Sequence, residues 1–218
     1  MTRRTSVLVA LILSAHLAFQ SPPAAAAETS HFRLSGHSLI GVWLTTETCW
    51  VAVTTVRFVS SVIQTDGQPQ VAPGLLVDVD FTYVCGPGGE GDPERFVLTG
   101  FIPAATWWIR GDLGVATLSG KVIVSDGAGV SLPVAVNLSF AATGELATVH
   151  DTFQSSAEGT VVTSRFRFSR REAQASGSVV AKFPVSTGDL TVNLTGGYPS
   201  LEGSIGKDVF GSSTVTKN

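Results

Sequence analysis

The stretch LLVDVDFTYV, residues 75–84, alternates apolar and polar side chains along most of its length. Its apolar set is Leu75, Val77, Val79, Phe81 and Tyr83, and its polar set is Asp78, Asp80 and Thr82. Successive side chains of a β-strand point to opposite faces, so an apolar residue at every second position indicates a strand with one face in a core. The stretch therefore predicts a half-buried strand.

The same alternation recurs through most of the chain. It is clear in LPVAVNLSF, residues 132–140, and in VVTSRFRFSR, residues 161–170. Clusters rich in glycine, aspartate and proline separate these runs, as expected of turns. We find no amphipathic helix after residue 27. The pattern predicts an all-β chain of roughly ten strands, folded as a single antiparallel β-barrel or as a two-sheet β-sandwich.

The first 27 residues have the features of a secretory signal peptide. Arg3 and Arg4 precede the apolar run 6–19, and Ala25–Ala27 supplies a small-residue cleavage site. We expect the mature chain to begin at Glu28 and to be secreted or held in the cell envelope. The style of the signal is bacterial.

We expect three segments: a signal peptide over residues 1–27, a short N-terminal arm over 28–33, and a single all-β domain over 34–218. No apolar run after residue 27 is long enough for a transmembrane helix. Without the signal, the chain has 12 lysines and arginines against 17 aspartates and glutamates. This balance argues against a nucleic acid partner, and nothing in the sequence indicates a cofactor.

The two cysteines predict one intrachain disulfide, Cys49–Cys85, because export leads to a compartment in which a bridge persists. If Cys49 faces Cys85 across a hairpin, Val51 meets Tyr83 and Val53 meets Phe81. This register places apolar side chains opposite one another, so we expect it for the hairpin.

Four tryptophans are present, and Trp107 and Trp108 are adjacent. Pro103 precedes this pair and glycines follow it, so the segment is typical of a connection in which strict alternation need not hold. Two interpretations remain open. Both rings plug one end of the fold, or one of them lines a ligand-binding surface. Trp107 and Trp108 are therefore our candidate ligand-binding residues.

Catalytic and metal-binding signals are weak. The histidines that remain after cleavage are scattered and match no zinc motif, so we predict no metal site. Asp78 and Asp80 share a strand face at a spacing that would suit acid–base chemistry on a sugar, but a solvated face is the simpler explanation. Arg165 and Arg167 would grip an anion or keep a strand soluble.

Three functions follow from these observations. The favoured one is an exported, non-catalytic binding or cell-surface interaction module of unknown ligand. The second is a lipocalin-like carrier, by architectural analogy alone, with an apolar ligand against Trp43, Trp50, Trp107 or Trp108. The third is a secreted hydrolase that uses Asp78 and Asp80. A structure distinguishes them by whether the interior is filled or hollow, and by where the carboxylates lie.

Overall fold

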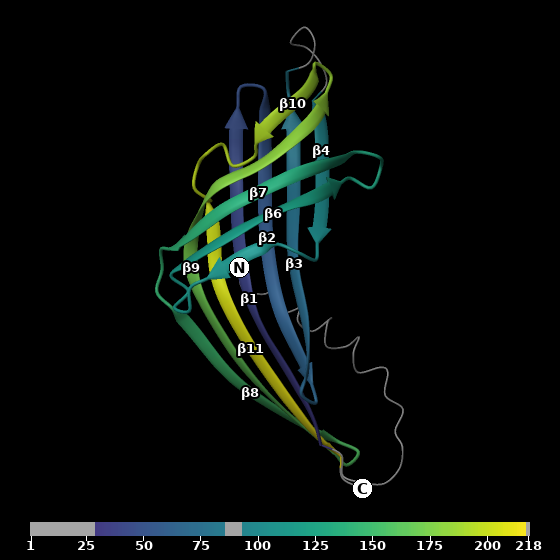
Figure 1. Ribbon diagram of the computed structural model, residues 1–218, viewed down its shortest axis with the longest axis vertical. Helices are drawn as coiled ribbons and strands as arrows, with labels where there is room; N and C mark the ends of the chain where they lie inside the picture. Colours follow the sequence, from purple (N-terminus) through teal and green to yellow (C-terminus); the bar gives the residue numbers. More distant parts are fainter. Residues whose placement is uncertain (1–28, 86–92, 217–218) are drawn as a thin grey trace.

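A computed structural model of the chain describes residues 29–85 and 93–216 (Figure 1). The expected signal peptide, residues 1–27, lies outside these ranges. The described part contains eleven strands and no helix: β1 (Thr29–Glu47), β2 (Trp50–Thr65), β3 (Gln68–Tyr83), β4 (Glu94–Ile102), β5 (Thr106–Ile109), β6 (Val115–Ser125), β7 (Ser131–Ala142), β8 (Ala147–Ala157), β9 (Thr160–Val185), β10 (Gly188–Asn193) and β11 (Glu202–Thr216). The all-β, antiparallel prediction is confirmed.

Eight of the strands form a closed ring in the order β9, β11, β1, β2, β3, β4, β6, β7 and back to β9. All pairs are antiparallel, and the junction of β4 with β6 is a single bridge between Thr99 and Ser125. The strands β5, β8 and β10 pair outside the ring. No helix among the described residues is both long and apolar enough to cross a membrane.

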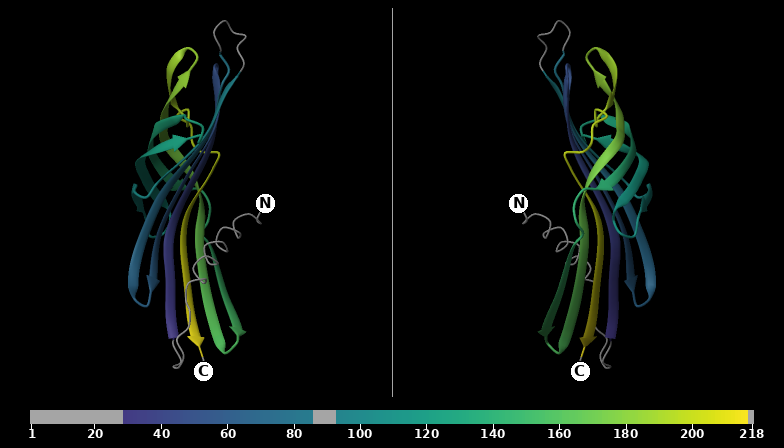
Figure 2. Two further views of the ribbon diagram at one scale, coloured as in Figure 1. Left: turned by 90° about the vertical axis from the view of Figure 1, so that its right-hand side faces the viewer. Right: turned by 90° about the vertical axis from the view of Figure 1, so that its left-hand side faces the viewer.

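The ring has two facing layers of strands only in its upper part. Here β5, β6, β7, β10 and the C-terminal half of β9 cross in front of the long strands (Figures 1 and 2). Below this barrel, β8, the N-terminal half of β9, β11, β1, β2 and β3 continue as one layer. We call this part the lower sheet. The molecule is thus a closed barrel, one side of which continues below the other as a single-layer sheet.

Apolar side chains fill the barrel. Phe81 of β3 stacks on Phe183 of β9 with ring centroids 3.9 Å apart. Trp43 is 1% exposed, and its indole N–H donates to the carbonyl oxygen of Tyr198 at 3.2 Å. The two facing layers contribute valines, leucines and phenylalanines to one continuous cluster. The interior among the described residues is a packed core, which leaves no chamber of the kind that a lipocalin-like carrier needs.

The β2–β3 hairpin corrects the predicted register by one residue. Trp50 pairs with Tyr83 and Ala52 with Phe81, whereas Val53 is 44% exposed on the outer face. The two-residue turn Asp66–Gly67, with φ of 49° and 84°, fixes this pairing. Positive φ at both positions matches the right-handed twist of the flanking strands, and an Asp-Gly pair favours it. The turn, not the cysteine pair, sets which β2 residues face inward.

The N-terminal arm expected over residues 28–33 is also corrected for its described part. β1 begins at Thr29, which pairs with Val215 of β11, and Phe32 also pairs with Thr65 of β2. A segment with a hydrogen-bonded neighbour on each side satisfies its backbone polar groups as a strand, so this segment is sheet from its first described residue.

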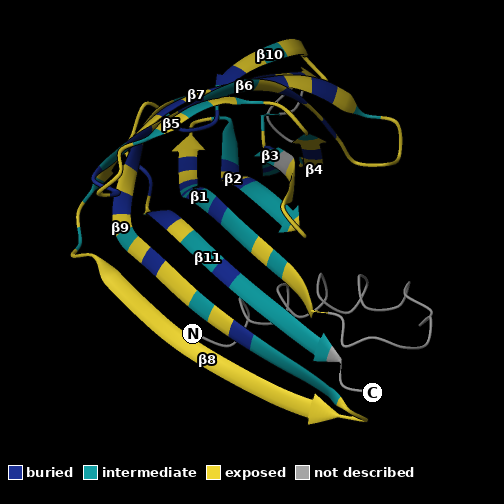
Figure 3. Ribbon diagram, turned by 60° about the horizontal axis from the view of Figure 1, so that its bottom comes forward, coloured by how far each residue is buried: buried dark blue, intermediate teal, exposed yellow. Residues whose placement is uncertain are grey.

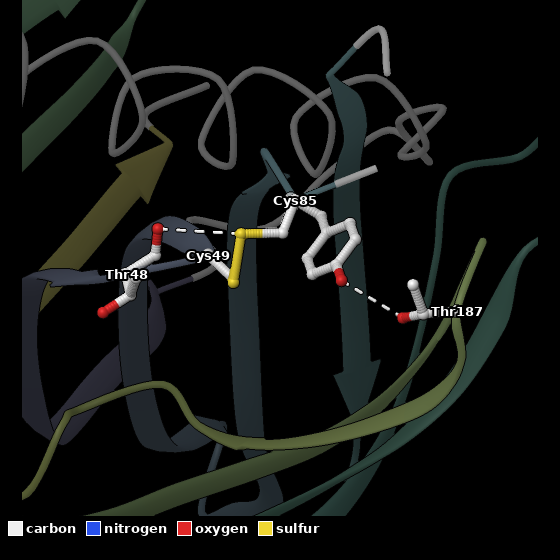
Figure 4. Close-up of a disulfide and its surroundings, with 5 residues drawn as sticks. Thr48, Cys49, Cys85 and Thr187 are labelled. Atoms are coloured by element: carbon white, nitrogen blue, oxygen red, sulfur yellow. Dashed lines mark hydrogen bonds between the residues drawn. A yellow bond between two sulfur atoms is a disulfide. The ribbon is translucent and has the colours of Figure 1, made fainter. Parts of the chain in front are cut away.

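The predicted disulfide Cys49–Cys85 is confirmed (Figure 4). Cys49 lies in the two-residue turn between β1 and β2, and Cys85 lies just after β3, so the bridge crosses the upper end of the hairpin. The backbone N–H of Val84 donates to the Cys49 carbonyl oxygen at 2.8 Å. Nearby, the hydroxyls of Tyr83 and Thr187 lie 3.1 Å apart, which joins β3 to the β9–β10 turn.

Replacing both cysteines, Cys49→Ser with Cys85→Ser, should lower the free energy of unfolding by up to about 4 kcal/mol. The bridge spans a sequence separation of 36 residues, and its loss frees that loop in the unfolded chain. Chemical denaturation with and without reductant measures the effect. Reduced wild-type protein should unfold like the double variant, and a wild-type midpoint insensitive to reductant contradicts the prediction.

Candidate functional site

The alternation of inward and outward side chains continues along the long strands from the barrel into the lower sheet. β1 pairs with β2 and β11 without a skipped residue, and so does β9 with β11. Leu39 of β1, Ala173 of β9 and Ile205 of β11 point into the core. Every second residue counted from them therefore lies on the same side of the lower sheet. We call this side the inner face and the opposite side the outer face.

The inner face of the lower sheet is basic. Across it, Lys207 pairs with His37, and Arg167 pairs with His150. An open groove follows this face, with five of the basic side chains in its lining. The strands β1, β8, β9 and β11 together supply Arg33, Arg165, Arg167, Arg171, Lys207, His31, His37 and His150.

Carboxylates are missing from the same rows. The inner-face positions 31–39 of β1, 148–154 of β8, 163–171 of β9 and 205–213 of β11 contain no aspartate or glutamate. Asp151 and Asp208 lie in these strands but alternate to the outer face. Arg33, Arg165, Arg167 and Lys207 are exposed, and none of them belongs to the three ion pairs found among the described residues.

Arg171 is the cation nearest the barrel, and it is half-buried. Its Nε–H is buried without a hydrogen-bond partner among the described residues. Asp112 in the β5–β6 loop is close enough to feel its charge. The Arg110 guanidinium bonded to Asp112 is the main reason that the pKa of this carboxyl falls to about 2, and the field of Arg171 adds a smaller lowering.

Aromatic side chains occupy the outer face of the lower sheet. The rings of Phe166 and Phe210 lie 4.6 Å apart, and Phe32 packs against Phe210 at 5.8 Å. Phe168 is 38% exposed. The lower sheet is therefore basic on the side that continues the core, and it carries a cluster of aromatic rings on the other side.

His37 and Trp107 mark the boundary between the core and the basic inner face. Their ring centroids are 5.6 Å apart, and Trp107 also contacts Phe58 of the core at 5.2 Å. Burial lowers the pKa of His37, and the neighbouring charge of Lys207 lowers it further. His37 is consequently neutral at pH 7, which suits its place beside an apolar ring.

The tryptophan pair obeys strand alternation, which corrects the expectation that a connecting segment would free it. Trp107 and Trp108 lie in β5, paired with Leu118 and Thr117 of β6. Trp107 is half-buried against the core, whereas Trp108 points outward and is 53% exposed. The pair does not form a common plug, because Trp107 packs against the core and Trp108 does not.

Asp78 and Asp80 are held by neighbours on the outer face of β3. Asp80 accepts two hydrogen bonds from the Arg95 guanidinium, at 3.0 and 2.8 Å, and Asp78 accepts one from the Thr99 hydroxyl at 2.8 Å. The bonds from Arg95 lower the pKa of Asp80. A general acid needs a raised pKa, so Asp80 lacks the electrostatics that the hydrolase hypothesis requires of a proton donor.

Comparison with known proteins leaves the function to the geometry. No family model and no curated protein matches the chain. Among solved structures, the translocator domain of autotransporter NalP from Neisseria meningitidis is 8% identical, with 95% of this chain and 94% of that chain covered and a TM-score of 0.15. The β domain of the Bordetella autotransporter BrkA is 9% identical over 88% and 100%, with a TM-score of 0.14. TM-scores this low do not establish a shared fold.

Sequence reasoning found part of the basic inner face and missed the rest. Arg165 and Arg167 alternate in one strand, which is visible in the sequence. Lys207 and Arg33 join them only because β9 pairs with β11 and β11 with β1. No local signal predicts these pairings, since the strands lie far apart along the chain.

Substitution of the two tryptophans should have unequal effects. Trp107→Ala removes a half-buried ring from the core and should lower the free energy of unfolding by about 2–3 kcal/mol. Trp108→Ala, its matched control in the same strand, should change it by less than about 0.5 kcal/mol because the ring is exposed. Thermal and chemical unfolding measure both variants. Equal losses would contradict the opposite orientations.

His37 should make stability depend on pH. Its folded pKa lies below the ordinary value of 6.5, so the unfolded chain binds the proton more readily. The stability that His37 contributes is present above pH 6.5 and is lost as the pH falls through 6.5 toward the folded pKa. Denaturation midpoints at about pH 7.5 and pH 5.5 should differ less in His37→Gln than in wild type. His150→Gln serves as an exposed control, and an unchanged difference in His37→Gln would contradict the assignment.

Proposed function

We propose that this protein is an exported, non-catalytic binding module that uses the basic inner face of its lower sheet to hold an acidic polysaccharide. One observation carries the proposal. Four exposed cations, Arg33, Arg165, Arg167 and Lys207, share a grooved face that has no carboxylate of its own, in a chain whose net charge is negative. Like charges gathered without counter-charges favour an anionic ligand.

Export is supported by the sequence of residues 1–27 and by the disulfide, since structural bridges persist in oxidising compartments. Outside the cytoplasm, polymers with carboxylate or sulfate groups are the abundant extended anions, which favours a polysaccharide over a nucleic acid. Guanidinium groups suit such ligands because they bind carboxylates and other oxyanions through paired N–H groups.

The basic inner face also offers an aromatic surface at its upper end, above the residues that line the groove. Trp107 is only half-buried, and the ring borders His37 at the top of the basic face. An indole beside a cationic surface suits the apolar face of a sugar ring. Trp107 therefore belongs to the proposed site. Trp108 lies on the opposite side of β5, and its role in ligand binding stays a prediction apart from this site.

Charge reversal on β9 tests the proposal with a control in the same strand. Arg167→Glu places a carboxylate on the inner face, and Arg170→Glu makes the same change on the outer face. Binding of the mature protein to dextran sulfate and to polygalacturonate should weaken about tenfold or more in Arg167→Glu, because a charge-assisted hydrogen bond contributes about 1.5–3 kcal/mol. Arg170→Glu should stay within about twofold of wild type.

Neutral dextran and single-stranded DNA complete the design. Neutral dextran should not bind, and added salt should weaken binding of both acidic polymers because exposed charges are screened. Equal losses of binding in Arg167→Glu and Arg170→Glu would mean that the polymers bind by general charge attraction and not at the inner face, which would overturn the proposal. DNA binding tighter than both polysaccharides would overturn the ligand class.

A further inference from the structure

β8 is an edge strand with one neighbour among the described strands. It pairs along its whole length, Ala147–Ala157, with β9, and no other described strand lies against its second edge. All eleven of its residues are exposed. Figure 3 shows it as a continuous exposed band along the margin of the lower sheet. Such an edge leaves a row of backbone donors and acceptors open to pairing.

The two margins of the lower sheet differ in how they are protected. The opposite margin is β3 below Leu75, where pairing with β4 ends. That segment contains Pro69 and Pro73, which remove backbone donors from the edge. β8 contains no proline, lysine or arginine, and its register with β9 has no bulge. One margin carries two prolines against strand addition, whereas Asp151 is the one acidic residue of β8.

The direction of the free donors follows from one hydrogen bond. The backbone N–H of Thr152 donates to its neighbour's side chain, Asp151 Oδ1, at 2.7 Å, so it points away from β9. N–H groups alternate in direction along a strand. The even-numbered residues from Thr148 to Ser156 therefore point their donors and acceptors toward the open edge, where an added strand would bind them. At Thr152 the added strand would replace Asp151 as the acceptor.

We propose that the partner at this edge is the β8 strand of a second copy of the protein, paired antiparallel about Thr152. Thr152 is the midpoint of β8, so this register pairs all eleven residues with the second copy. It sets Asp151 opposite Phe153 of the second copy and His150 opposite Gln154, which leaves no like charges facing one another within the strand. A twofold axis here makes the edge its own complement.

Apolar side chains support the same register. Val149 and Phe153 are 60% and 58% exposed on the outer face of the monomer. In the paired strands, Phe153 lies diagonally across the axis from its own equivalent, within reach of an aromatic contact. The pairing also places two basic inner faces side by side in one continuous sheet. It does not depend on what those faces bind.

Sedimentation equilibrium of the mature protein tests this inference, with two variants at one position. Gln154→Pro removes a backbone donor from the open edge and blocks the added strand. The hydrogen bonds between β8 and β9 are made by odd-numbered residues of β8, so the proline leaves them in place. Gln154→Val keeps the donor. We expect a concentration-dependent dimer in wild type and in Gln154→Val, and a monomer in Gln154→Pro with unchanged circular dichroism. A wild-type monomer at all concentrations, or a dimer unaffected by proline, overturns the proposal.

A cysteine cross-link tests the register even if the proline variant does not fold. Thr152→Cys places two thiols directly opposite, with Cα atoms about 5.5 Å apart, which a disulfide spans. Oxidation should therefore give a covalent dimer. In His150→Cys the equivalent atoms lie about 14 Å apart along the strands, and no cross-link should form. Cross-linking in both variants or in neither contradicts the twofold at Thr152.

Discussion

The long strands of this protein have one alternation of inward and outward side chains but two surroundings, a packed core above and water below. β1, β2, β9 and β11 pass from the two-layer barrel into the one-layer lower sheet without a bulge in their pairings. The side that is buried above is therefore open to water below. A continued apolar inner face would expose a broad hydrophobic surface wherever the second layer is absent. The alternation is kept, and the residue types at its inner positions change instead.

The change from apolar to basic residues occurs within one inward position of the same level in three neighbouring strands. Leu39 and Ile205 are fully buried, and two residues further down lie His37 and Lys207. On β9 the change comes one inward position higher, because Arg171 pairs with Ile205 and lies below the buried Ala173. A free charge has no place in a packed apolar core, because burial without a partner is costly. The extent of the second layer thus decides where cations appear, and the basic inner face is a consequence of the architecture as much as of composition.

The sequence was enough for the strands and for the disulfide, because alternation, turn residues and cysteine number are local signals. It was not enough to show which face of each strand lies toward the core. The cysteine pair suggested Val53 as inward, although the Asp66–Gly67 turn contained the information that makes Ala52 inward instead. For Arg165 and Arg167, alternation shows that they share a side but not which side continues the core. That answer depends on β11, whose pairing with β9 no nearby residue indicates.

The pairing of β1 with β11 has a consequence for the time course of folding. Thr29 meets Val215, so the first described strand needs the last one as its neighbour. The hairpins β1–β2 and β2–β3 join close segments and are able to form early, whereas closure of the ring waits until nearly the whole chain is present. Contacts of such long sequence separation form slowly. During synthesis from the N-terminus, β1 therefore stays unpaired on its β11 side until the last strand has been added, although its partner on the other side, β2, is available early.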